Sequence, residues 1–127
     1  MLSGLRRIGG WTTRLLVPHV CHGCGTIVAE TGTLCPECWA GVRFLEKPWC
    51  AVLGTPFAHD LGEDAVSPEA MAAPPDFDRA RSAVIHDGVA RQMVQALKYG
   101  DRTDLGPGMA RWMARAGSEL LGDTDII

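Results

Sequence analysis

Apolar residues recur at helical spacing in two runs in the second half of the chain. The shorter run is Val89, Met93, Val94 and Leu97, and the longer run is Leu105, Met109, Trp112, Met113, Ala116, Leu120 and Leu121. This spacing predicts two helices, the first ending at Gly100 and the second at Gly122, because glycine commonly follows the last turn of a helix. Each stripe is typical of a face that packs into a core.

The pattern before these helices is shorter and less regular. Residues 80–86 (ARSAVIH) predict a strand that Asp87-Gly88 closes with a turn. Residues 51–76 contain several prolines and glycines and are expected to form a loop-like linker. Apolar positions between Leu2 and Leu16 are compatible with a short amphipathic helix that stops at Pro18.

Four of the five cysteines form two closely spaced pairs. Cys21 and Cys24 make one C-x2-C pair, and Cys35 and Cys38 make a second pair after ten intervening residues. Each tight turn directs two sulfurs at one point, and together they complete the tetrahedron that zinc prefers at about 2.3 Å. Four sulfurs leave no coordination position for water, so the spacing predicts one structural Zn²⁺ ion in a zinc ribbon.

Residues around these thiols fit two metal-binding turns. Gly23 and Gly25 are expected to relax the first turn, because glycine adopts positive φ values without a side-chain clash. Pro36 fixes one φ angle in the second turn, and Trp39 is expected to cover the site with a large apolar ring. Residues 26–34, between the turns, predict a short hairpin.

Other chemistry for the thiols stays open at this point. Two disulfides would need an oxidising compartment, and an iron–sulfur cluster or unliganded thiols are further alternatives. His19 and His22 flank or enter the first turn and are alternative ligands, although four sulfurs already satisfy the ion. The spacing favours zinc.

The charge of the chain is mildly acidic and unevenly distributed. The 127 residues carry 12 Lys+Arg and 15 Asp+Glu, a net charge of −3. Residues 1–50 hold five basic and three acidic side chains, whereas residues 51–127 hold seven and twelve. This composition gives no general support for binding to a polyanion.

Neither a membrane span nor export is expected. No stretch reaches the roughly 18 uninterrupted apolar residues of a transmembrane helix. The apolar segment after Arg6 and Arg7 is interrupted at Gly9 and Gly10, before the core of a signal peptide could form. We therefore expect a cytoplasmic protein.

Motifs for catalysis are missing from the sequence. It contains no glycine-rich dinucleotide loop, no Walker-type lysine motif and no His-Glu-x-x-His. Ser82, His86 and Asp87 have the residue types of a nucleophile set but lie within one predicted strand and turn, where they do not converge. We therefore predict neither catalytic nor cofactor-binding residues.

Short segments follow one another in a recognisable order along nearly the whole chain. They are CHGCG…LCPECW (21–39), Phe44, PWC (48–50), GTPF (54–57), PP (74–75), FDRARSAV (77–84), ALKYGDRTDLG (96–106) and MARWMARAG (109–117). This succession resembles the ComF family of competence-associated, phosphoribosyltransferase-like proteins, whose members have an N-terminal double zinc ribbon.

The resemblance implies an α+β or α/β fold, in which the zinc ribbon precedes the opening strand and helices of a type I phosphoribosyltransferase-like domain. Residues 1–75 are then the zinc ribbon region, with a degenerate second ribbon and a linker. Residues 76–127 are then an N-terminal fragment of the second domain. Residues 124–127 look like the start of a buried strand, so the chain is expected to be truncated.

The family's second zinc site would need thiols near positions 50, 53, 67 and 70. This chain has Cys50, Leu53, Ser67 and Ala70 at those positions. One sulfur does not hold zinc tightly against water. We therefore expect one zinc ion, at the two C-x2-C pairs, and a free thiol at Cys50.

The resemblance also implies a loop for phosphoribosyl pyrophosphate, an acidic pair followed by a Thr/Gly-rich turn, which this sequence lacks. As it stands, the chain is therefore expected to be non-catalytic. The resemblance links it to uptake of single-stranded DNA in competence, beside a helicase partner. One alternative is a fragment of an active phosphoribosyltransferase whose substrate loop lies beyond the C-terminus.

A second alternative is a zinc-ribbon adaptor that binds nucleic acid. Bases would stack on exposed aromatic rings beside basic groups. The residues available for this are Trp39, Phe44 and Trp49 near Arg43 and Lys47. A further candidate basic patch surrounds the predicted strand and first helix, and consists of Arg79, Arg81, Arg91, Lys98 and Arg102.

Overall fold

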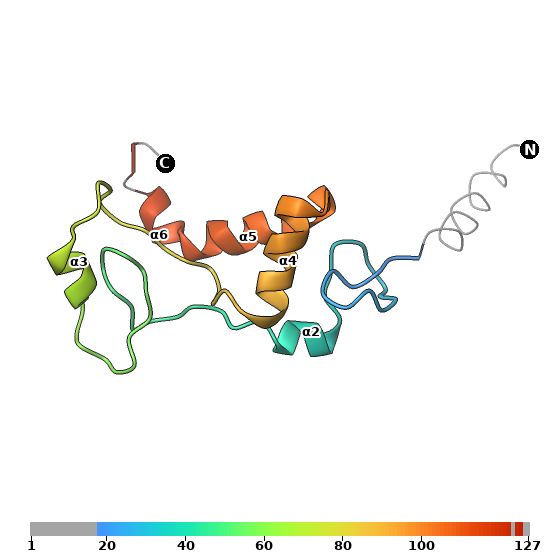
Figure 1. Ribbon diagram of the computed structural model, residues 1–127, viewed down its shortest axis with the longest axis horizontal. Coiled ribbons are helices and arrows are strands. Elements are labelled where there is room, and N and C mark those ends of the chain that lie inside the picture. The colour runs from blue at the N-terminus through green and yellow to red at the C-terminus, as the bar shows by residue number, and fades with distance from the viewer. Residues whose placement is uncertain (1–17, 123, 126–127) are drawn as a thin grey trace, which may run out of the picture.

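The computed structural model describes residues 18–122, 124 and 125 of the chain (Figure 1). Its helices are α2 (Pro36–Ala40), α3 (Pro68–Ala72), α4 (Gly88–Tyr99), α5 (Gly106–Ala116) and α6 (Ser118–Leu121), with a 3-10 helix η1 (Thr103–Leu105) before α5. The helix predicted between Leu2 and Leu16 lies outside the described residues. Among the described helices, none has the length and apolarity to cross a bilayer.

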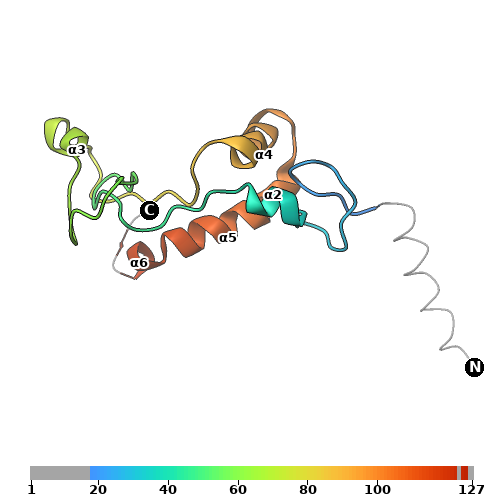
Figure 2. The ribbon, with the colours of Figure 1, turned by 90° about the horizontal axis from the view of Figure 1, so that it is seen from below.

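Two zinc-ribbon-like units lie at opposite ends of the described chain, and α5 and α6 run between them (Figures 1 and 2). We call residues 19–40 the first ribbon, which includes α2, and residues 48–72 the second ribbon, which includes α3. Residues 51–76 were predicted to be a loop-like linker. Helix α3 and a turn at residues 51–53 lie within this segment, and most of the rest lies outside regular structure.

The two predicted helices form, with one break. Helix α4 ends at Tyr99, and the backbone N–H of Gly100 donates to the carbonyl of Ala96, as predicted for a glycine after the last turn. The longer run is divided into η1, α5 and α6. The break lies at Gly117, where glycine weakens the helix because it loses more conformational freedom than other residues on folding.

The strand predicted over residues 80–86 shrinks to a single bridge between Phe44 and Val84. Two hydrogen bonds flank it, from the N–H of Leu45 to the carbonyl of Ala83 (3.0 Å) and from the N–H of Ile85 to the carbonyl of Arg43 (2.8 Å). The start of the segment bonds to the second ribbon instead. Since its hydrogen bonds go to two different partners, no continuous ladder forms. The described residues are thus helical with almost no strand.

The strand expected at residues 124–127 is likewise not seen where the structure describes it. Thr124 and Asp125 are exposed and lie outside regular structure, and residues 126 and 127 lie outside the described part. A sheet core of the kind expected for a phosphoribosyltransferase-like domain is therefore not found in the described residues.

Small, separate groups of side chains hold the elements together. The buried residues are Cys21, Cys38, Val42, Cys50, Ser67, Ala70, Ala90, Met93 and Leu105. Three aromatic rings join the first ribbon to α5, since Trp39 and Trp112 both pack on Phe44 with ring centroids 5.3 Å away. The first ribbon is therefore positioned by packing against the helices that follow it.

Candidate metal centre

The four paired cysteines converge on one point. The Sγ atoms of Cys21, Cys24, Cys35 and Cys38 all lie within 4.8 Å of one another. The Sγ atoms of Cys24 and Cys35 are 3.7 Å apart. A zinc ion with Zn–S bonds of about 2.3 Å spaces its tetrahedral ligands about 3.8 Å apart, so this thiol set fits zinc. The described residues form no disulfide.

The first metal-binding turn is closed by backbone hydrogen bonds. The N–H of Cys21 donates to the carbonyl of Thr26 (2.7 Å), and the N–H of Gly25 donates to the carbonyl of Cys21 (3.0 Å). Gly25 has φ +76°, a left-handed conformation that glycine adopts without a clash. A single bridge between Val20 and Ile27 closes the base of the turn, in place of the predicted hairpin over residues 26–34.

Gly23 is needed for space rather than for its φ angle. A Cβ atom at this position would lie 2.7 Å from Cys38 Sγ and 3.0 Å from a methyl group of Val89 in α4. The first turn therefore approaches both the opposite thiol and α4 more closely than any residue with a side chain allows. This corrects the expectation that Gly23 relaxes the turn.

The second metal-binding turn is the start of helix α2. Cys35 is the N-cap residue, Pro36 occupies the first turn of the helix, and the N–H of Cys38 donates to Cys35 Sγ (3.4 Å). Proline suits this position because its missing N–H would have no partner within the helix and its φ angle is already helical. The helix start thus places the sulfurs of Cys35 and Cys38 on the side that faces the first turn.

Backbone donors prepare part of the site for negative charge. Cys21 Sγ accepts hydrogen bonds from the N–H of Gly23 (3.3 Å) and of Cys35 (3.1 Å). Burial raises the pKa of Cys21, but the backbone donors outweigh it and lower the pKa to about 6. The hydroxyl of Thr26, 3.1 Å from Cys24 Sγ, lowers the pKa of that thiol.

Cys38 has the opposite tendency. Burial, followed by its thiol neighbours, raises the pKa of Cys38 well above its usual value. Four thiols at this spacing do not all ionise by themselves, because their charges repel one another. A divalent cation at the centre would remove that repulsion, so the donor set suits a metal better than free thiols.

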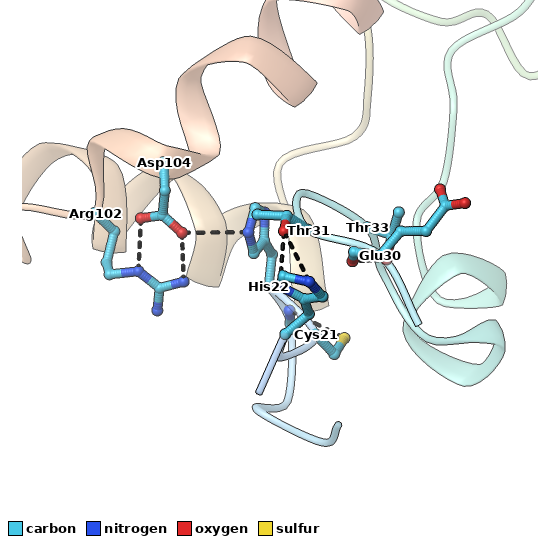
Figure 3. A network of polar contacts seen from close by, with 9 residues as sticks. Cys21, His22, Glu30, Thr31, Thr33, Arg102 and Asp104 are labelled. Carbon is cyan, nitrogen blue, oxygen red and sulfur yellow. Dashed lines mark hydrogen bonds and ion pairs between the residues drawn. The ribbon is translucent and has the colours of Figure 1, made fainter. Parts of the chain in front are cut away.

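The neighbouring histidines point away from the thiols. His22 Nε2 lies 3.2 Å from Asp104 Oδ2, and Asp104 is itself held by two hydrogen bonds from Arg102 (Figure 3). The Arg102 guanidinium beside Asp104 lowers the pKa of that carboxyl. His19 Nδ1 lies 2.7 Å from Thr31 Oγ1. Both side chains therefore serve structural contacts, and within the described residues the metal-type cluster consists of cysteines.

Trp39 directly follows Cys38 but packs on other aromatic rings. Its centroid lies 5.3 Å from that of Phe44 and 6.1 Å from that of Trp112. The prediction that Trp39 covers the thiols is replaced by a role in joining the ribbon to α5. No sequence pattern indicates this pairing, because Trp112 is one apolar position among several on a helical stripe.

The second ribbon keeps one thiol at the corresponding place. Cys50 is fully buried, and its Sγ accepts from the N–H of Leu53 (3.4 Å) and of Ser67 (3.2 Å). Burial raises the pKa of Cys50, but hydrogen bonds from the Ser67 hydroxyl and from backbone N–H groups outweigh it and lower the pKa to about 7. Leu53 and Ala70 offer no ligand atom, so no second metal cluster forms among the described residues.

One of three comparisons with known proteins agrees with this geometry. Residues 12–71 match the family described as a double zinc ribbon domain. The match covers both C-x2-C pairs, Cys50 and nearly all of α3. The comparison with curated proteins gave no match, and neither did the comparison with solved structures. None of the three points to the ComF family in particular, which stays a prediction.

A groove of about 360 Å³ lies between the first ribbon, the second ribbon and α5. Its walls include four aromatic residues, two basic groups and two acidic groups: Trp39, Phe44, Trp49 and Trp112, Lys47 and Arg115, and Glu46 and Glu119. The sequence predicted the first three aromatic residues and Lys47 as one surface. It missed Trp112 and Arg115, which the fold supplies from α5.

Three other arginines have acidic partners. Arg43 pairs with Asp87, and Arg102 pairs with Asp104. The Arg81 side chain is 8% exposed, pairs with Glu119 and lies 5.3 Å from the centre of the Trp49 ring. Two members of the basic patch predicted around residues 79–102, Arg81 and Arg102, are therefore paired with carboxylates, which weakens their part of that patch as a phosphate-binding surface.

Proposed function

We propose that this chain is a structural zinc protein in which Cys21, Cys24, Cys35 and Cys38 bind one Zn²⁺ ion. The observation that carries this proposal is the convergence of the four Sγ atoms within 4.8 Å. Four thiolates fill the tetrahedral shell of zinc and leave no position for a substrate or water. The ion would fix the first ribbon, which has few buried apolar residues of its own, and the chain would act as a binding module rather than as a catalyst.

The order of the elements supports the finer ComF-like assignment. The elements follow one another in the order that the resemblance implies. This order is the first ribbon, a ribbon with three ligands replaced, the segment that pairs at Val84, and helices α4 and α5. We propose on this basis that residues 76–127 derive from a phosphoribosyltransferase-like domain. We propose that the chain works in the cytoplasm, because free thiol ligands require a reducing compartment. From the resemblance, we also propose that it acts with the machinery for DNA uptake, including a helicase.

Metal analysis of the purified protein tests the zinc proposal. We expect about one zinc ion per chain, because only one thiol set is complete. Cys38→Ser removes a buried ligand and is expected to abolish tight binding. Cys50→Ser is the matched control, since Cys50 is also buried but lies outside the thiol cluster, and this variant should keep the ion. Zinc-free protein, or equal loss in both variants, would contradict the proposal.

The enzyme alternative is tested by the gene. A continuation of the reading frame past residue 127, or one restored by a single frameshift, that encodes an acidic pair and a Thr/Gly-rich loop would favour a phosphoribosyltransferase. In that case the residues described above would be its zinc-binding start.

The aromatic groove supports a second candidate function, the binding of single-stranded nucleic acid. Trp39 is 51% exposed there, beside Lys47 and Arg115. Aromatic rings stack on bases of any sequence, and nearby cations attract the phosphates. Fluorescence titration with a labelled single strand at low and at high salt tests this. Trp39→Ala should weaken binding, whereas Tyr99→Ala, which removes a more exposed ring outside the groove, should not.

A further inference from the structure

The two ribbons have the same backbone architecture although only one has a complete thiol set. In the second ribbon the N–H of Cys50 donates to the carbonyl of Thr55 (2.8 Å), and the N–H of Gly54 donates to the carbonyl of Cys50 (2.9 Å). These are the bonds that Cys21 and Gly25 make in the first ribbon. Each turn is closed by one antiparallel bridge, and each contains a glycine with positive φ.

The second halves of the ribbons correspond as well. Ser67 caps α3 as Cys35 caps α2, since its hydroxyl accepts from the N–H of Ala70 (3.3 Å). The sequences after these caps, Pro36–Ala40 and Pro68–Ala72, both begin Pro-Glu. The positions of four ligands are thus retained in the second ribbon, while three of the ligands are gone.

Hydrogen bonds to one sulfur take over part of the role of the ion. In the first ribbon, two N–H groups, one from each turn, donate to Cys21 Sγ. In the second ribbon, Leu53 and Ser67 donate to Cys50 Sγ in the same way, so this sulfur still joins the two turns. Cys50, Ser67 and Ala70 are buried, so three of the four ligand positions stay closed to solvent without a complete thiol set.

The segment at residues 80–81 supplies the remaining support. The N–H of Ala80 donates to the carbonyl of Val52 (2.8 Å), and the Arg81 guanidinium donates to the carbonyl of Ala51 (2.9 Å). A Cβ atom on Gly54 would lie 2.5 Å from the carbonyl oxygen of Ala80, which shows how closely the two backbones approach. The second ribbon is therefore held by close protein contacts at Gly54, whereas a Cβ atom on Gly25, the corresponding glycine of the first ribbon, would meet open space.

We propose that the second ribbon is a metal-independent ribbon, which keeps the fold of a zinc site through the bonds to Cys50 Sγ and its docking on residues 80–81. Removal of metal would then open the first ribbon and leave the second ribbon folded. Bound zinc would then determine whether the first ribbon, which bears α2, is folded. The second ribbon would stay folded and in contact with α6 with or without zinc.

Thiol labelling of the whole chain with N-ethylmaleimide, located by peptide mass spectrometry, tests this proposal. After zinc is removed with a chelator under reducing conditions, we expect Cys50 to react at least about 100-fold more slowly than the first-ribbon thiols, because it must wait for the second ribbon to open. All five thiols should react alike in concentrated urea. Labelling of Cys50 as fast as the others after chelation would overturn the proposal.

This outcome is separable from the zinc proposal. A purified chain without metal would contradict one-zinc binding, yet the contrast between Cys50 and the other thiols would still be expected. A low thiolate fraction would not explain slow labelling, because the hydrogen bonds keep the pKa of Cys50 at about 7.

Restoring the missing ligands gives an independent test of the shared backbone. The variant Leu53→Cys/Ser67→Cys/Ala70→Cys should raise the zinc content from about one to about two ions per chain. The matched control carries the same three substitutions together with Cys50→Ser. This protein should release the ion of its second ribbon at a lower chelator concentration than the triple variant does. A triple variant with wild-type circular dichroism and only one ion would overturn the claim that the second ribbon retains the metal-site geometry.

Discussion

His22 Nε2 contacts Asp104 Oδ2 at 3.2 Å, which ties the first metal-binding turn to the 3-10 helix that precedes α5. His22 stands between two candidate zinc ligands, and its side chain is only 5% exposed. The His22 side chain therefore lies in the contact with the helical part rather than in the thiol cluster. The contact lets the first ribbon and the helical part stabilise each other.

Asp104→Ala is expected to loosen this connection. The substitution leaves the buried ring nitrogen of His22 without its partner, at a cost of about 1 to 3 kcal/mol in the free energy of unfolding. Chemical denaturation with zinc present measures the change. Asp76→Ala, at an exposed acidic position without a positive φ angle, is the control. Equal stability of the two variants would show that the His22 contact contributes nothing.

The local chemistry of the site could be predicted from the sequence because it depends on neighbours along the chain. Two C-x2-C pairs determine which sulfurs meet, and the structure brings those four together. Helix α4 was equally accessible, since its apolar positions and Gly100 lie within one short segment. Spacing acts over a few residues and identified the four thiols and the end of α4, although it did not reveal the roles of Gly23 and Trp39.

The predictions failed where a distant partner decides the outcome. A strand at residues 80–86 needs a continuous neighbour, but Ala80 bonds to the second ribbon and Val84 bridges Phe44. Residues 51–76 were predicted to be a loop-like linker from their prolines and glycines, but most of them belong to the second ribbon. Its fold depends on contacts of Cys50 Sγ and Arg81 that no local pattern reveals.

Gly23→Ala is expected to disrupt the first ribbon. Its Cβ atom would meet Cys38 Sγ at 2.7 Å, so either the thiol or α4 must move. Overpacking of this kind costs about 1 to 3 kcal/mol, and displacement of a ligand should also weaken zinc binding. Gly41→Ala is the matched control, because the same addition there makes only ordinary contacts from 3.4 Å outward.

Competition with a zinc chelator measures the effect of Gly23→Ala on affinity, and thermal unfolding measures its effect on stability. Wild-type zinc affinity in Gly23→Ala, with Gly41→Ala equally stable, would show that the close approach of the first turn to Cys38 is not needed.

Arg81→Ala is expected to detach the second ribbon from α6. The side chain joins Glu119, the carbonyl of Ala51 and the ring of Trp49. Its loss leaves a buried carbonyl without a charged donor and should cost about 1 to 3 kcal/mol in the free energy of unfolding. Arg91→Ala, at an exposed position of α4, should change stability by less than about 0.5 kcal/mol.

Hydrogen exchange locates the effect of Arg81→Ala. Faster exchange is expected at the amides of residues 50–55, with the first ribbon unchanged. Exchange that speeds up uniformly along the chain would mean that Arg81 stabilises the whole molecule rather than this one contact.

Zinc affinity is expected to rise with pH above neutrality. The metal binds thiolates, and the pKa of Cys38 is raised by burial and by its thiol neighbours, so that thiol still carries a proton at pH 7 to 8. Each proton displaced on binding makes the affinity rise about tenfold per pH unit. The pKa of Cys21 is about 6. Below that pH its proton must also leave, and the dependence becomes steeper by a further factor of about ten per unit.

Chelator competition between pH 5.5 and 8.5 checks this dependence, with Cys50→Ser as the control, because Cys50 lies outside the thiol cluster and its loss should leave the curve unchanged. An affinity that stays constant from pH 7 to 8 would mean that all four ligands are already ionised in the metal-free protein. The backbone N–H groups that donate to Cys21 and Cys35 would then also stabilise the thiolate form of Cys38. In that case the ion would not be needed to overcome repulsion among the four sulfurs.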